Sequence, residues 1–342
     1  MAIHVLARRV LLSLAGAAVC AGATLVGTQA GGPLGIGRVF SPNPVATLQD
    51  QSLTDQKDAD YPALQPAYRQ VVLTNLDGSG SLRGDWANVV SETGPPAFSP
   101  DNIFLFGRHD DRFEQVMAYY WVTEAQRYIQ RLGFGTTLRP INRQSQDVRI
   151  NQWGADNSYS WAKHDVIRFG KGGVDDAEDA EVILHEYAHA MVDSQVPPFG
   201  IGGSLEAAAI GEGFADYWAV TVSNVIAPTP DPACVADWDS TSYTATAPHC
   251  LRRVDYDLRY PEDLAGEVYH DGLIWSRALW DIRGALGHVK ADTIILEGIF
   301  GFDPYTTMPA AAEATVKAAE RLYGRAAAKA VARVFQARGI LP

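Results

Sequence analysis

The segment VILHEYAHAMV at residues 182–192 limits the fold of this chain more than any other, because it places two histidines on one face of a predicted helix. His185 and His189 are four residues apart, and residues at that spacing share a helical face, so both imidazoles can bind one metal ion. Glu186 lies about 100° around the helix, too far displaced to be a natural ligand but placed to take a proton from a water at the metal. A core helix that happens to contain two histidines is the alternative.

A second segment, SLEAAAIGEGFADYWAV at residues 204–220, contains candidates for a third ligand. A catalytic zinc site has three protein ligands and one open position. Glu206 and Glu212 are both candidates. Glu212 is followed four residues later by Asp216, which lies on the same helical face and can accept a hydrogen bond from a ligand histidine. Because buried carboxylates need a cation or a donor, the two segments together predict a zinc site.

These motifs resemble those of the glutamate-type zinc metallopeptidases, above all the fungalysin family and its thermolysin-like relatives. The similarity rests on HEYAH at 185–189 and GEGFAD at 211–216, supported by GLIWSRALWDIR at 272–283 and Ala-rich segments ending in ARGIL, and it covers roughly residues 100–342. It implies an α+β, thermolysin-like fold of two lobes, an N-terminal α/β lobe and a mainly helical C-terminal lobe, with the HExxH helix between them. The implied roles are zinc ligands for His185, His189 and Glu212, general base for Glu186, and hydrogen-bond partner of a ligand for Asp216.

The sequence departs from the family pattern at a histidine that donates a hydrogen bond to the transition state. The resemblance places this histidine three residues before Gly272, in EVYHDGLIW, where the chain has Tyr269. His270 is one residue later, a rotation of about 100° on a helix. We expect His270 to take the role, because an imidazole matches it and the following Asp-Gly permits an irregular turn. The phenol of Tyr269 is the alternative donor, and a third alternative is that both side chains only pack and the enzyme is slow.

Two further segments contain candidates for substrate binding. DNSYS at 156–160 precedes a strand-like segment, as a substrate-binding stretch does in thermolysin-like enzymes, which makes Asn157 and Ser158 candidates. Pairing with an edge strand would suit an extended peptide, whereas the alternative is a surface loop. Arg252 and Arg253 lie where the family has an arginine that holds a peptide carbonyl. The alternative is that these arginines are ordinary surface charges.

The acidic run DDAEDAE at 175–181 makes calcium a candidate cofactor beside zinc, because Ca²⁺ prefers oxygen ligands. The alternative needs no metal. Acidic residues at the start of a helix are stabilised by the positive end of the helix dipole.

The first thirty residues differ from the rest of the chain. Arg8 and Arg9 precede an apolar run that ends in small residues, which predicts a signal peptide at 1–30. The run is near bilayer-spanning length, so we expect membrane contact only if it is not cleaved. Without this segment the remaining cysteines are Cys234 and Cys250, natural disulfide partners in an oxidising compartment. These features predict a secreted or extracytoplasmic protein.

Composition and periodicity indicate a globular protein of 342 residues, with 47% hydrophobic and 20% charged residues. A net charge of −12 argues against a nucleic-acid partner. Hydrophobic spacing predicts helices at 110–132, 309–323 and 326–338. The oligomeric state is left open. The predicted organisation is a strand- and loop-rich region at 31–100, an α/β lobe with the zinc helix at 101–203, and a helical C-terminal lobe at 204–342.

The sequence therefore predicts a secreted zinc-dependent endopeptidase that acts on peptide or protein substrates, with Glu186 as general base for a metal-activated water. The sequence contains no GxSxG nucleophile elbow, no phosphate-binding loop and no complete GxGxxG. It also lacks the GxMEN segment of related aminopeptidases, which favours an endopeptidase. The alternative is a secreted binding module that retains the fold with weak or no activity. The intact zinc motif argues against it.

Overall fold

The structure is a computed structural model that describes residues 32–199 and 203–342. The predicted signal peptide at 1–30 lies outside the described residues. Within the described part, none of the helices combines the length and apolar character that a bilayer-spanning segment requires.

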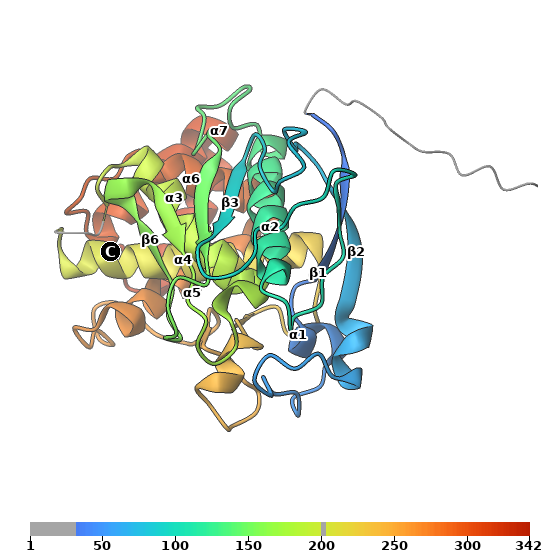
Figure 1. Cartoon of the computed structure of the whole chain (residues 1–342). Helices are drawn as coiled ribbons and strands as arrows, with labels where there is room; N and C mark the ends of the chain where they lie inside the picture. Colours follow the sequence, from blue (N-terminus) through green and yellow to red (C-terminus); the bar gives the residue numbers. More distant parts are fainter. Residues whose placement is uncertain (1–31, 200–202) are drawn as a thin grey trace, which may run out of the picture.

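Two small sheets form the N-terminal half (Figure 1). The first has the order β2-β1-β4 and consists of β1 (Gly35–Phe40), β2 (Tyr68–Leu73) and β4 (Ile103–Phe104). The second has the order β3-β5-β7-β6 and consists of β3 (Ala87–Ser91), β5 (Gln146–Ile150), β7 (Val166–Arg168) and β6 (Tyr159–Trp161). Strands β3, β5 and β7 are parallel, and β6 pairs antiparallel with β7. Strand β6 is therefore an edge strand.

Helix α2 (Arg112–Arg131) lies between the two sheets and contacts both (Figure 1). Because it is covered on opposite sides, apolar side chains that point in nearly opposite directions, such as Tyr119 and Trp121, are fully buried. The helix ends just before Gly133, whose φ of 104° is a conformation that glycine adopts without strain. The helix predicted at 110–132 is confirmed.

Helix α3 (Ala180–Gln195) contains HEYAH, and helix α4 (Leu205–Ile226) contains GEGFAD. Helix α3 packs against β6, β7 and α2 on one side and against α4 on the other. Side-chain caps fix where both helices begin: Asp179 accepts a hydrogen bond from the Glu181 amide, and Ser204 accepts one from the Ala207 amide. The HExxH helix thus lies between the sheet-containing part and the helical part, as predicted.

The helical C-terminal part continues with α5 (Val268–Leu286), α6 (His288–Ile299) and α7 (Met308–Ala337). Helix α7 covers both predicted Ala-rich helices and breaks at Gly324, with φ 78° and ψ −178°, in the gap between 309–323 and 326–338. The predicted α+β, two-lobe fold is therefore confirmed. The proposed domain boundaries stay predictions.

Helices α4 and α5 approach each other closely at a pair of glycines. A Cβ atom on Gly213 would lie 2.2 Å from the backbone oxygen of Gly272. This contact leaves no room for any larger residue at position 213. Because Glu212 precedes Gly213 and Tyr269 lies one turn before Gly272, the glycine pair also fixes the separation of these two side chains.

Residues 227–267, which connect α4 to α5, form what we name the cross-linked excursion. In it, β8 (Cys234–Val235) pairs antiparallel with β9 (Arg252–Arg253). Cys234 and Cys250 form a disulfide with their Cα atoms 5.2 Å apart. The predicted disulfide is therefore confirmed.

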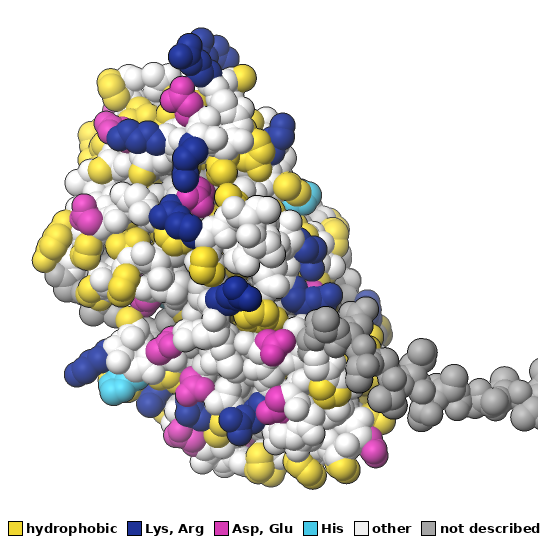
Figure 2. Space-filling view, turned by 90° about the horizontal axis from the view of Figure 1, so that it is seen from above, with side chains coloured by type: hydrophobic (Ala, Val, Ile, Leu, Met, Phe, Trp, Pro, Cys, Tyr) yellow, Lys and Arg dark blue, Asp and Glu magenta, His cyan; other side chains and the backbone are white. Residues whose placement is uncertain are grey.

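Charged side chains of both signs are scattered over the face seen in Figure 2 and do not gather into one basic patch. The absence of a nucleic-acid partner stays a prediction.

Candidate metal centre and catalytic cleft

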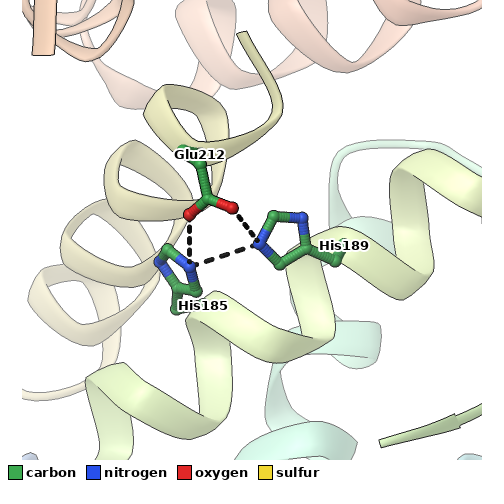
Figure 3. Close-up of side chains that lie close together, drawn as sticks. All are labelled: His185, His189 and Glu212. Carbon is green, nitrogen blue, oxygen red and sulfur yellow. Dashed lines mark hydrogen bonds and ion pairs between the residues drawn. The ribbon is translucent and has the colours of Figure 1, made fainter. Parts of the chain in front are cut away.

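Helices α3 and α4 bring the side chains of His185, His189 and Glu212 together (Figure 3). The Nε2 atoms of the two histidines are 3.2 Å apart. Oε2 of Glu212 lies 3.2 Å from Nε2 of His185, and Oε1 lies 3.6 Å from Nε2 of His189. Since the histidines come from α3 and the glutamate from α4, the packing of these two helices forms the cluster.

The cluster fits a zinc ion. Zinc binds nitrogen and oxygen ligands at about 2.0–2.2 Å, so ligand atoms at the corners of a tetrahedron around it are about 3.3 Å apart. The three observed separations run from 3.2 to 3.6 Å. Oε2 of Glu212 is also buried without a hydrogen bond. A buried carboxylate oxygen beside two imidazole nitrogens is the donor set that zinc prefers.

The electrostatics of the cluster favour positive charge at the imidazoles. Burial lowers the pKa of His185, but the neighbouring carboxylates of Asp216 and Glu212 raise it to about 10. Burial raises the pKa of Glu212, but the neighbouring imidazoles of His189 and His185 hold it far below the usual range. A metal cation bound at the imidazoles would balance the negative charge of Asp216 and Glu212, as protons on the imidazoles do.

Asp216 is shared by His185 and Arg252. Its Oδ1 lies 2.9 Å from Nδ1 of His185, so Nε2 of that ring is directed toward the cluster. Arg252 donates to the same carboxylate through Nε at 2.6 Å and Nη2 at 2.8 Å. Asp216 is only 1% exposed, so both contacts are shielded from water. This is the geometry required of a residue that orients a ligand histidine.

Glu186 lines the same cavity but is not part of the ligand cluster. It is 7% exposed, and its Oε2 atom is buried without a hydrogen bond. Burial raises the pKa of Glu186, against the opposing charges of His185 and His189. A carboxylate with a free oxygen and a raised pKa is suited to accept a proton.

The site opens into a cavity of about 500 Å³ that follows α3. Val182 lines it near the start of the helix and Val192 near the end, with the metal cluster between them. The other walls come from residues 156–160, from α4, from the cross-linked excursion and from the first turn of α5. A cavity that passes both sides of the metal cluster has room for a chain on either side of a scissile bond.

Tyr269 lines this cavity, whereas His270 does not. The Tyr269 ring centroid lies 5.1 Å from the Arg252 guanidinium carbon. Helix α5 is regular from Val268, and the Glu267 side chain accepts hydrogen bonds from the amides of both Tyr269 and His270. The irregular turn that would carry His270 into the cleft is therefore not formed. The structure thus places Tyr269, rather than His270, in the cavity wall, and the assignment of the transition-state donor stays a prediction.

The remaining substrate-binding candidates divide into two groups. Asn157, Ser158 and Arg252 line the cavity. Arg253 does not, and its Nε donates to Asp255 at 2.8 Å. Neighbouring residues of a strand point to opposite faces, which explains why only one of the two arginines of β9 reaches the cleft.

The acidic run at 175–181 does not converge on one point. Glu178 binds Arg108 at 2.9 Å, and Asp179 caps α3. Glu181 accepts hydrogen bonds from α4 and from the cross-linked excursion. The structure gives Glu178, Asp179 and Glu181 protein partners, and a calcium ion held by the run stays a prediction.

Sequence reasoning missed three aspartates that meet at the cavity wall, Asp156, Asp176 and Asp239. One carboxylate oxygen of each lies within 4.8 Å of those of the other two. Asp176 belongs to the acidic run, but Asp239 comes from the cross-linked excursion, which has no recognisable motif. No spacing in the sequence indicates that these residues meet.

Comparison with known proteins agrees with this geometry. The family model for the fungalysin metallopeptidases (M36) matches residues 152–340. The solved structure of the precursor of protealysin, a metalloproteinase from Serratia proteamaculans, is similar with a TM-score of 0.59 and 16% sequence identity, covering 75% of this chain and 87% of that chain. At that identity the similarity shows the fold alone. No curated protein matches the chain.

Proposed function

Because the chain belongs to the fungalysin family of metallopeptidases, we propose that it is a secreted, zinc-dependent endopeptidase. The observation that carries the proposal is the convergence of His185, His189 and Glu212 at separations of 3.2 to 3.6 Å. In this proposal these three residues hold the zinc. Asp216 orients His185 through its Nδ1 atom.

Zinc, when bound, supplies a Lewis acid that polarises the scissile carbonyl and makes water more acidic. Glu186 accepts a proton from the attacking water through its free Oε2 and passes it to the leaving amine. The burial of Glu186 supports this role, because a raised pKa helps the carboxylate hold the proton between the two transfers.

Tyr269 and Arg252 supply donors at the cavity wall. The Tyr269 hydroxyl donates to the oxygen that becomes negative in the transition state. The charge of Glu212 and burial raise the pKa of Tyr269, so the hydroxyl keeps its proton at neutral pH. Arg252 holds a substrate carbonyl and is itself fixed by two hydrogen bonds to Asp216.

The substrate is an extended peptide that pairs with the edge strand β6. That strand uses one side to pair with β7, and Tyr159 and Ser160 line the cavity beside Asn157 and Ser158. Main-chain pairing of this kind suits peptides of varied sequence. It supports cleavage within a chain rather than recognition of a terminus.

The disulfide between Cys234 and Cys250 supports a secreted location, because such bonds persist in oxidising compartments. The predicted signal peptide supports the same location. An inactive binding module is the weaker alternative, because binding alone gives no reason to bury Glu186 with a free oxygen beside two histidines.

The test is a comparison of wild-type protein with Glu186→Gln. We expect about one zinc per chain in both, but casein hydrolysis in the wild type only, because the substitution removes the base and no ligand. Metal content by mass spectrometry and casein digestion with and without chelator are the measurements.

Glu206→Gln is the matched control on α4. Glu206 accepts a hydrogen bond from the Met308 amide at 2.7 Å, and glutamine keeps that acceptor. We expect this variant to behave like the wild type. Undiminished hydrolysis by Glu186→Gln, or a wild-type protein that does not retain zinc, would contradict the proposed function.

A further inference from the structure

We propose that Asp156, Asp176 and Asp239, together named the aspartate cluster, form a substrate pocket for the cationic side chain of a lysine or arginine next to the scissile bond. The inference rests on the proposed peptidase function and names its substrate class. The proposed mechanism makes no use of these residues. They nevertheless line the same cavity as the zinc ligands.

Two of the three carboxylates are deeply buried. Asp176 and Asp239 are each 3% exposed, and Oδ1 of each has no hydrogen-bond partner among the described residues. One oxygen from each of the three residues lies within 4.8 Å of the others. Among the described residues, no lysine or arginine forms an ion pair with any member of the cluster.

Such an arrangement is costly unless a cation completes it, because buried carboxylates that share a site repel each other. Burial raises the pKa of Asp176 to about 7. The donors that do reach the cluster are hydroxyls: Ser158 donates to Asp176, and Tyr243 donates to Asp156 at 2.5 Å. A hydroxyl carries no positive charge, so these contacts provide no counter-charge for the carboxylates.

The cavity also provides a path for the alkyl part of a lysine or arginine. Val182 lies on α3 about 4.5 Å toward the N-terminus from His185, and Asp176 precedes the start of that helix. A side chain that leaves the metal cluster in this direction passes Val182 before it reaches the acids. Leu251 and Val235 line the same cavity and add apolar surface. Lysine and arginine bury their methylene groups on such surface.

An ammonium or guanidinium group matches the cluster better than a resident calcium ion does. Calcium takes six to eight oxygen ligands, commonly including backbone carbonyls. Here three residues converge, and hydroxyl donors already occupy an oxygen of Asp156 and of Asp176. A lysine ammonium has three hydrogen-bond donors, one for each carboxylate.

The first experiment maps cleavage sites. The zinc-loaded protein digests a mixture of proteome-derived peptides, and mass spectrometry identifies the residues on both sides of each cleaved bond. We expect lysine and arginine to be enriched at one of the two flanking positions. Two peptides that differ only by lysine or norleucine at that position then give a ratio of kcat/KM values. We expect the lysine peptide to be preferred by about tenfold to 100-fold, the range for hydrogen bonds to charged groups.

Asp239→Asn tests the assignment, because it removes one carboxylate that can pair with a cation and changes the shape of the side chain little. We expect it to lower the lysine-to-norleucine ratio by about tenfold. Asp193→Asn is the matched control. Asp193 lines the same cavity near the C-terminal end of α3, so its substitution also removes one carboxylate from the cavity, at a site away from the aspartate cluster. We expect the ratio to stay unchanged in that variant.

A binding measurement keeps the inference testable if hydrolysis is slow. Zinc-loaded Glu186→Gln is titrated with the two peptides by calorimetry, and the lysine peptide should bind more tightly by a similar factor. Equal binding of both peptides would overturn the inference. Hydrolysis without enrichment of basic residues would overturn it while leaving the proposed function intact.

A calcium titration tests the alternative that the aspartate cluster binds a metal ion. With zinc saturating, added Ca²⁺ should not raise the melting temperature of the wild type more than that of Asp239→Asn. A calcium-dependent rise that Asp239→Asn abolishes would assign the cluster to a metal ion and overturn the substrate pocket.

Discussion

Tyr269→Phe is the sharpest test of how the cleft stabilises its transition state. The substitution removes one hydroxyl and keeps the ring, which lies against Arg252 with a centroid-to-carbon distance of 5.1 Å. The Tyr269 side chain is half exposed at the cavity wall, so the loss of the hydroxyl leaves no buried void. Any change in turnover therefore reports the hydrogen bond rather than a repacked cleft.

The expected loss is about 100- to 1,000-fold in kcat, the effect of removing one donor to a developing oxyanion, or about 2.7–4 kcal/mol. KM should change little, because the interaction strengthens only in the transition state. His270→Ala should retain at least about a third of wild-type turnover, a change of under 0.7 kcal/mol, because that side chain is not part of the cavity wall.

The assay is steady-state hydrolysis of a quenched fluorescent peptide, with zinc content measured for each variant. Full zinc occupancy in both variants confirms that the kinetic difference does not come from the metal. A large loss in His270→Ala together with near wild-type turnover in Tyr269→Phe would refute the assignment. Two near-neutral variants would show that neither side chain donates to the transition state.

Three further predictions follow from contacts around the cleft. Asp216→Asn should weaken zinc binding by about tenfold to 100-fold, measured by competition with a chelator, because the carboxylate that orients His185 is lost. Cys250→Ser should lower the free energy of unfolding by about 3 kcal/mol in denaturant titrations, because the disulfide closes a loop between residues 16 apart. Burial and the charge of Asp179 raise the pKa of Asp237 to about 8, so its folded form favours the proton. The protonated carboxyl of Asp237 should therefore stabilise the fold fully below about pH 4, and this stabilisation should be lost as pH rises toward 8. The melting temperature should fall over the same pH range, and Asp237→Asn should reduce that fall.

The metal centre was predictable from sequence because its geometry is local. His185 and His189 lie on one helix, where a spacing of four residues fixes their relative direction. Glu212 and Asp216 are related in the same way on α4. Only the contact between the two helices had to come from the resemblance. Helix boundaries such as Gly133 and Gly324 were readable for the same reason, since each depends on the conformation of one residue.

The rest of the cleft depends on contacts that no local pattern encodes. The choice between Tyr269 and His270 depends on where α5 begins, and the Glu267 cap makes it regular from its first turn. Arg252 and Arg253 are adjacent, and only the pairing of β9 with β8 directs one of them inward. Asp239 is separated from Asp176 by 62 intervening residues, so their meeting is a product of the whole fold.

The proposed hydrolytic residues and part of the substrate-binding surface come from different parts of the chain. The proposed metal ligands and base are on α3 and α4, whose positions are set by the buried core. Asp239 reaches the cavity from the loop between Cys234 and Cys250, which has little regular structure, and Leu251 follows that loop directly. Exchange of residues within that loop can therefore alter which peptides fit while leaving the hydrolytic machinery in place. Related chains can therefore differ in substrate preference through this segment while they retain the same metal ligands and general base.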